Sequence, residues 1–162
     1  MKDVSQVKQI IGTQFWAGSQ DDILAFLQVT PSIRSVICLR RDVPEWWFTL
    51  QQTQGQYPVF VHAPVPSIHE VGTEAALLTI LDSVFPGIML PVVFFCLKGR
   101  NRTGMLAAMI RFEVTFSISK AKMEYRFRAG TSFRHEESQL LTKMCEMRLH
   151  NPAARTSICN YL

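Results

Sequence analysis

The residues best suited to chemistry lie at positions 91–112, in the run PVVFFCLKGRNRTGMLAAMIRF. An apolar segment ends at Cys96, and apolar residues resume with helical spacing after Gly104. A loop between a buried strand and a helix can direct several backbone N–H groups at one point, where the helix N-terminus adds partial positive charge. The spacing therefore predicts an anion site above the Cys96 thiol.

Each residue type in this loop has a use in phosphate chemistry. Gly99 allows a tight backbone path, and the planar guanidinium of Arg102 can hold two phosphate oxygens. The positive field favours the thiolate of Cys96, which is the nucleophilic form. The alternative is a buried structural thiol beside solvated loop charges. We predict that Cys96 is a nucleophile and that phosphate is bound by Arg102 and by Leu97, Lys98, Gly99, Arg100 and Asn101.

The segments around this loop predict secondary structure that alternates before it and is helical after it. Strands are predicted at 35–39, 57–65 and 91–96, and helices at about 20–27, 43–52, 73–85, 105–116, 118–127 and 136–149. Residues 16–19 are predicted to form a turn. This order predicts an α/β fold in which a central, mostly parallel sheet is flanked by helices on both faces.

Length and composition limit the class of protein. The 162 residues fit one domain, which we place at 1–162. No apolar run is long enough for a membrane span and no secretory signal is evident, so we expect a cytoplasmic protein. The net charge of +4, without a basic run, favours anionic partners but does not indicate nucleic acid.

The cysteines indicate neither a metal site nor a disulfide scaffold. There are four of them, Cys38, Cys96, Cys145 and Cys159, and they are widely scattered without a C-x-x-C pair. We expect reduced thiols, with Cys38 and Cys145 in the core. No metal or other cofactor is predicted.

The segment CLKGRNRTG at 96–104 resembles the C-x5-R-[ST]-G loop of the cysteine-dependent protein tyrosine and dual-specificity phosphatases. The resemblance covers about residues 12–130. Within the family, the chain is most similar to the small, atypical dual-specificity-like phosphatases of bacteria, fungi and plants. The resemblance extends through FWAGSQDDILAFLQVTPSIRSVICLR, VHAPVPS and SKAKMEYRF. Rhodanese-like sulfurtransferases have a loop shorter by one residue, which fits phosphate less well. The resemblance implies a dual-specificity-phosphatase-like fold.

The resemblance also implies a reaction, the hydrolysis of a phosphate monoester through a phosphocysteine intermediate. Cys96 would attack phosphorus, and Arg102 would bind the phosphoryl oxygens and the transition state. Thr103 would help the thiolate leave during hydrolysis of the intermediate. The family mechanism requires no metal.

The sequence departs from the family at two positions. Phe95 stands where a histidine usually helps to hold the thiolate. Ser67 aligns with the general-acid aspartate, and a serine hydroxyl is far too weak an acid for that role. We predict Glu70 as the substitute acid, with His69 as the alternative; otherwise both residues face solvent.

Three substrate classes are compatible with this loop. An inositol phosphate or phosphoinositide ranks first, because Lys98 and Arg100 offer two further cations. A phosphoprotein ranks second, and RNA 5′-phosphate removal third, because the NRTG ending resembles the RNA triphosphatase branch. The alternative to an enzyme is a pseudophosphatase that binds a phosphorylated partner. Resemblance to some phosphoinositide phosphatases also implies that Cys38 could trap oxidised Cys96 in a disulfide.

Overall fold

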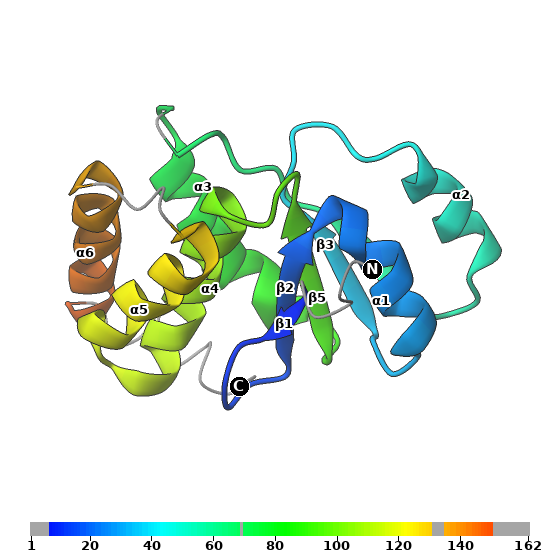
Figure 1. Cartoon of the computed structure of the whole chain (residues 1–162), viewed down its shortest axis with the longest axis horizontal. Coiled ribbons are helices and arrows are strands. Elements are labelled where there is room, and N and C mark those ends of the chain that lie inside the picture. Colours follow the sequence, from blue (N-terminus) through cyan, green and yellow to red (C-terminus); the bar gives the residue numbers. More distant parts are fainter. Residues whose placement is uncertain (1–6, 69, 131–134, 151–162) are drawn as a thin grey trace.

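The computed structural model describes residues 7–68, 70–130 and 135–150 (Figure 1). Within them, five strands form one sheet in the order β1-β2-β5-β3-β4, with β1 antiparallel to β2 and the other pairs parallel. The strands are β1 Lys8–Gln9, β2 Phe15–Ser19, β3 Ser35–Cys38, β4 Val59–His62 and β5 Val92–Cys96. The helices are α1 Gln20–Val29, α2 Trp46–Thr53, α3 Thr73–Thr79, α4 Asn101–Thr115, α5 Ile118–Ala129 and α6 His135–Leu149.

The helices cover both faces of the sheet, as predicted. Helices α1 and α2 lie on one side, and α3 to α6 lie on the other (Figure 1). Alternate residues of the central strand β5 feed two separate cores: Val93 and Phe95 face the α1 side, while Phe94 and Cys96 face the α4 side. The predicted α/β architecture is therefore confirmed.

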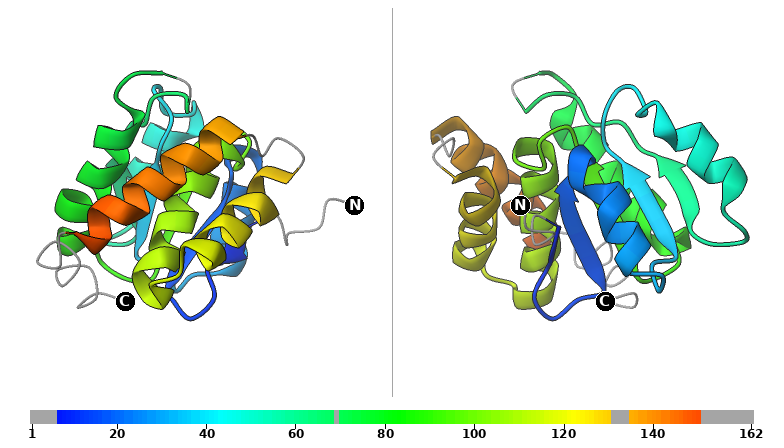
Figure 2. Two further views of the ribbon diagram at one scale, coloured as in Figure 1. Left: turned by 90° about the vertical axis from the view of Figure 1, so that its left-hand side faces the viewer. Right: turned by 45° about the vertical axis from the view of Figure 1, so that its right-hand side comes forward.

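Helix α6 forms an outer layer over α4 and α5 (Figure 2). Its Cys145 is fully buried, and the Sγ atom lies 3.9 Å from the Sδ atom of Met109 on α4. Burial raises the pKa of Cys145 to about 12, so this thiol stays protonated at neutral pH. The prediction that Cys145 belongs to the core is confirmed.

Two local predictions were wrong. Residues 16–19 are not a turn but most of strand β2, which pairs with β5 along its whole length. The predicted helix at 73–85 is an α-helix only as far as Thr79, where α3 ends. A π-helix at Ile80–Val84 and a 3-10 turn at Phe85–Gly87 follow it. The strand depends on its pairing with a distant segment, which the local pattern does not contain.

The sheet order sets the place of the site. Strand β5 lies between β2 and β3, and all three are parallel. Their carboxyl ends therefore meet at one edge of the sheet, where Cys96 ends β5 and the chain turns into α4. Ligands of open parallel sheets bind at this edge.

Candidate active site

Cys96 lies at the bottom of a short loop, 97–100, that joins β5 to α4. The cysteine is 4% exposed, whereas Leu97 is 44% exposed, so the chain passes from the core to the surface within one residue. Helix α4 begins at Asn101 and has no acidic residue in its first turn. Its positive N-terminus is therefore free to favour an anion at the loop.

The loop depends on the absence of a side chain at Gly99. This residue has a φ angle of +68°, in the left-handed region. A Cβ atom there would lie 2.5 Å from the carbonyl carbon of Gly18 and 2.7 Å from the backbone nitrogen of Ser19. The loop thus packs directly on the end of β2, which fixes its shape.

Gly99→Ala is expected to lower phosphatase activity by about 100-fold or more, because misplacing reacting groups by about 1 Å has this effect. The left-handed backbone adds roughly 1–2 kcal/mol of strain for a residue with a Cβ atom. Activity on an aryl phosphate and the melting temperature measure the two effects. Gly87→Ala is the matched control, since nothing lies within 4 Å of its added Cβ. Wild-type activity in Gly99→Ala would show that the loop shape is not required.

Arg102 and Thr103 lie in the first turn of α4, directly after the loop. The Nη1 atom of Arg102 lies 3.5 Å from the carbonyl oxygen of Val65, which places the guanidinium beside the segment after β4. The Thr103 hydroxyl is fully buried and has no hydrogen-bond partner in the described part of the chain. A buried hydroxyl without a partner costs free energy, so this group is available to a ligand or an anionic sulfur.

Asn101 turns its side chain away from the loop and towards the helical layer. Its Nδ2 atom donates to the Tyr125 hydroxyl at 3.2 Å and to the Glu137 carboxylate at 3.3 Å. Burial and the charge of Glu137 raise the pKa of Tyr125, so the phenol remains protonated. The side chain of Asn101 therefore anchors the start of α4 to α5 and α6, a role that the sequence analysis did not assign to it.

The segment with the candidate general acids is a tight loop at the start of α3. The Thr73 hydroxyl donates to the carbonyl oxygens of Ser67 at 2.7 Å and Glu70 at 3.0 Å, and the Glu70 N–H donates to Ser67 at 2.8 Å. The side chains of Ser67 and Glu70 are exposed. His69 lies outside the described residues. The role of Glu70 as an acid stays a prediction.

Phe95, in the position of the family histidine, belongs to an aromatic cluster on the far face of the sheet. Its ring centroid lies 5.8 Å from that of Trp46 and 6.1 Å from that of Trp47. Trp47 is 3% exposed. The two tryptophans and Phe95 therefore pack together in the core on the α2 side.

Cys38 and Cys96 lie on neighbouring strands, but their side chains face opposite sides of the sheet. The register pairs Cys38 with Phe95, and both belong to the core on the α1 side, whereas Cys96 belongs to the core on the α4 side. Burial raises the pKa of Cys38 further from neutral pH. A disulfide between the two cysteines stays a prediction, and Cys38 is a core residue, as its strand position indicates.

The sequence analysis missed a cation at the edge of the sheet. Arg40 follows β3, and its guanidinium Nη1 donates to the side chain of Gln20, the first residue after β2. The Nε2 atom of His62 donates to the Arg40 carbonyl oxygen at 2.7 Å, which supports a structural role for this histidine. The sequence contained an indication of this cation, because Arg40 comes directly after the predicted buried strand at 35–39.

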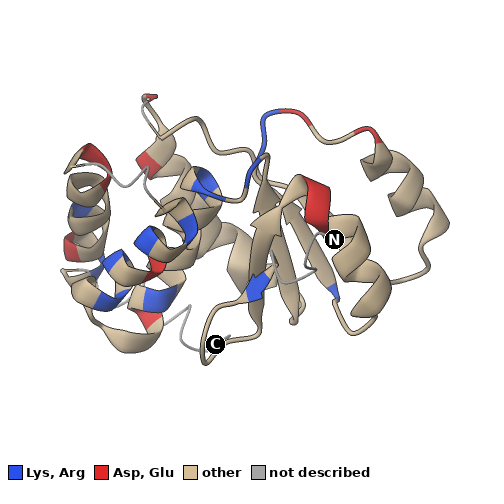
Figure 3. Cartoon of the chain, viewed as in Figure 1, with Lys and Arg blue, Asp and Glu red and all other residues tan. Residues whose placement is uncertain are grey.

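Positive charge gathers around the start of α4 and along α5 (Figure 3). Among the described residues, no three His, Cys, Asp or Glu side chains are grouped so that they could hold a metal ion. No described helix combines the length and apolar character needed to cross a bilayer. The positive charge around the start of α4 favours an anion at the loop.

Several solved structures share this fold at low sequence identity. The core catalytic domain of SIW14 from S. cerevisiae, described as a PP-IP phosphatase in complex with citrate, matches with a TM-score of 0.74. The two chains are 19% identical, over 97% of this chain and 94% of that chain. TpbA from P. aeruginosa matches with a TM-score of 0.62 and 20% identity, over 98% of this chain and 94% of that chain.

A third structure, PTPMT1, matches with a TM-score of 0.59 and 16% identity, over 91% of this chain and 98% of that chain. No family model matches the chain, and no curated protein matches its sequence. At these identities the likeness establishes the fold, so the predicted dual-specificity-phosphatase-like fold is confirmed. What the site does must be argued from its own residues.

Proposed function

We propose that the chain is a cysteine-dependent phosphatase that hydrolyses phosphate monoesters through a phosphocysteine intermediate. One observation carries the proposal: a buried thiol ends the central strand, directly below a loop that leads into an acid-free helix N-terminus. The first turn of that helix supplies Arg102 and the unpartnered Thr103 hydroxyl. Together these groups place positive charge and hydrogen-bond donors around a nucleophile.

The reaction proceeds in two displacements at phosphorus. The Cys96 thiolate attacks, a sulfur–phosphorus bond forms, and the bond from phosphorus to the leaving oxygen breaks. Arg102 and the N–H groups of the loop hold the equatorial oxygens. Water then attacks the phosphocysteine and releases phosphate, while the Thr103 hydroxyl donates to the departing sulfur.

The first displacement leaves a negative oxygen that an acid would protonate. Glu70 is the carboxylic acid on the loop beside Arg102, whereas Ser67 cannot serve. We therefore assign the acid role to Glu70, with His69 as the alternative. A good leaving group, such as nitrophenolate, departs without this help.

A steep dependence of rate on leaving-group basicity is expected if the acid is weak or absent. With Glu70 as the acid, Glu70→Gln should raise the ratio of the rate on 4-nitrophenyl phosphate to the rate on an alkyl phosphate about 10²–10⁴-fold over wild type, the range that general acid catalysis covers. If Glu70 serves, Glu70→Gln should lower the rate on alkyl phosphates and leave nitrophenyl phosphate nearly unchanged. The matched control is Glu146→Gln on α6, which is also exposed. A flat dependence in wild type, Glu70→Gln and His69→Ala would place the acid elsewhere.

Among substrates, an inositol phosphate or phosphoinositide is proposed first. Lys98 and Arg100 are exposed cations in the loop, and a substrate with one phosphate leaves them unused. The description of SIW14 as a PP-IP phosphatase supports this class. The structure of a TpbA variant in complex with pTyr supports the second class, a phosphoprotein. RNA 5′-phosphate removal remains the third.

A pseudophosphatase is the rival function, and Phe95 and Ser67 are the residues that favour it. Retention of the thiol, Arg102 and Thr103 opposes it, because a binder has no need of a nucleophile. Phosphate release from 4-nitrophenyl phosphate and from a panel of inositol phosphates decides between them. Saturable binding of these compounds without turnover of any of them would show that the protein is a pseudophosphatase and not an enzyme.

A further inference from the structure

A cavity of about 260 Å³ lies against the side of the candidate catalytic loop. The loop supplies one wall through Lys98, Gly99 and Arg100. The other walls come from Lys8 of β1, from Ser19 at the end of β2, and from Phe127 and Arg128 near the end of α5. Segments from the start, middle and later part of the chain thus meet here, immediately beside the proposed phosphate site.

Four cationic side chains line the cavity, and three of them have no carboxylate partner among the described residues. Within the described residues, neither Lys8, Lys98 nor Arg100 forms an ion pair with a carboxylate. Arg128 differs, because its Nε atom donates to Glu124 at 2.9 Å. Like charges that face one cavity repel each other, and an anion bound among them would remove this cost.

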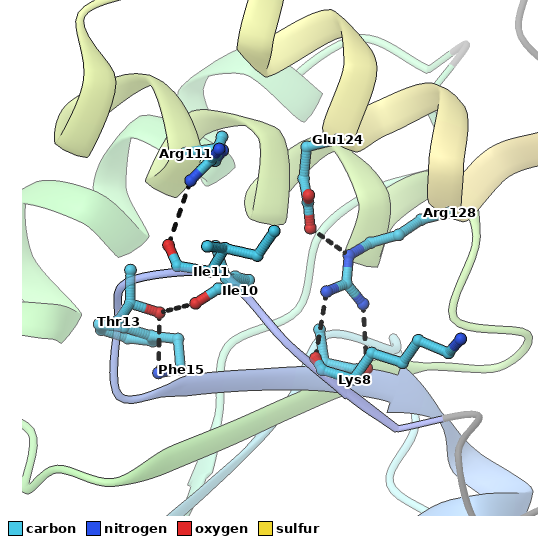
Figure 4. Close-up of polar contacts among 9 residues, drawn as sticks. Lys8, Ile10, Ile11, Thr13, Phe15, Arg111, Glu124 and Arg128 are labelled. Carbon is cyan, nitrogen blue, oxygen red and sulfur yellow. Dashed lines mark hydrogen bonds and ion pairs between the residues drawn. The ribbon is translucent and has the colours of Figure 1, made fainter.

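Arg128 fixes the position of Lys8 instead of acting as a ligand itself. Its Nη2 atom donates to the Lys8 carbonyl oxygen at 3.1 Å, and its Nη1 atom donates to Ala17 at 3.0 Å (Figure 4). Lys8 and Ala17 are partners in the β1–β2 register. The guanidinium therefore clamps a two-residue edge strand through its backbone and leaves the lysine side chain available.

The side chain of Lys8 has a defined place at this cavity. Its ammonium nitrogen lies 5.2 Å from the ring centroid of Phe127, within the range of a cation–π contact. Phe127 is 61% exposed, so the pair stands at the surface, where a ligand can reach it. An anion can then bind Lys8 while the ring keeps the ammonium oriented.

We propose that this cavity binds a second phosphate group of the substrate while the Cys96 loop holds the phosphate that is cleaved. Lys8, Lys98 and Arg100 are the ligands, and the substrate class is a small molecule with several phosphates. The inference rests on the proposed function for the first phosphate. The two sites share Lys98, Gly99 and Arg100, so one molecule can occupy both.

The test compares Lys8→Ala with Lys120→Ala, which removes the same charge from an exposed lysine that does not line this cavity. The measured quantity is the kcat/KM on myo-inositol hexakisphosphate divided by that on 4-nitrophenyl phosphate. This ratio should fall about tenfold in Lys8→Ala, the loss expected for one charged hydrogen bond at an open site. It should stay at the wild-type value in Lys120→Ala and in Lys8→Arg, which keeps the charge.

A binding measurement separates this inference from the proposed function. Calorimetry on Cys96→Ser protein follows hexakisphosphate without turnover, and Lys8→Ala in that background should weaken binding about tenfold. If wild type cleaves no ester, the proposed function fails, while this measurement still tests the cavity. Equal affinities for hexakisphosphate in the Cys96→Ser protein with Lys8→Ala and in that with Lys120→Ala would overturn the inference. An equal loss of affinity for inorganic phosphate would also overturn it, because the cavity would then hold a separate ion.

Discussion

Replacing Cys96 by serine is expected to abolish turnover of every phosphate ester while phosphate binding persists. The serine hydroxyl is a far weaker nucleophile than a thiolate, and removing a covalent nucleophile costs more than about 10⁴-fold in rate. Binding survives because the loop N–H groups, the α4 N-terminus and Arg102 are unchanged. Phosphate release and calorimetry with a non-hydrolysed anion measure the two quantities.

Arg102→Ala should instead lose both turnover and binding, because this side chain holds the phosphoryl oxygens in both states. Arg102→Lys should rescue little of the activity, since an ammonium cannot replace a planar fork. Cys38→Ser is the matched control for the thiol: it removes a buried cysteine from the adjacent strand on the opposite face of the sheet. Turnover by Cys96→Ser above a trace would remove the nucleophile assignment.

The largest loss of stability is expected from Arg148→Leu at the end of α6. Arg148 is 3% exposed, and its Nε atom donates to Glu113 of α4 at 2.7 Å. Its Nη1 atom donates to Asp82 of the π-helix at 2.6 Å. Burial alone lowers the pKa of Arg148, but Glu113 and Asp82 outweigh burial and raise it, so the side chain stays charged.

Removing one partner of a buried ion pair costs about 3–5 kcal/mol, because the remaining charge loses a short, charged hydrogen bond in the core. Glu113 is 1% exposed, so its carboxylate cannot turn to solvent without moving α6. Urea unfolding measures the change in unfolding free energy. The double variant Arg148→Leu, Glu113→Leu should recover part of the loss, because it removes both members of the buried pair. A loss below about 1 kcal/mol, which is typical of surface pairs, would contradict this account.

The chemistry of the candidate site could be predicted from sequence because it lies in one continuous segment. The strand that ends at Cys96, the glycine, the arginine and the helix that follows are all neighbours in the chain between 92 and 115. Local propensity and residue spacing are sufficient to predict the structure of such a continuous segment. The alternation of strands and helices also predicted the architecture, since a parallel sheet needs crossover helices.

Tertiary structure decided the features that join distant segments. Residues 16–19 form a strand because β5, some 75 residues later, supplies their hydrogen-bond partners. The face of the sheet on which Cys38 lies and the direction of the Asn101 side chain likewise depend on contacts with other segments. Lys8 and Lys98 line one cavity only in the folded chain, where β1 pairs with β2 and Arg128 bonds to the backbone of both strands. A sequence pattern records the propensity of neighbouring residues, whereas long-range pairing and packing fix which surfaces meet.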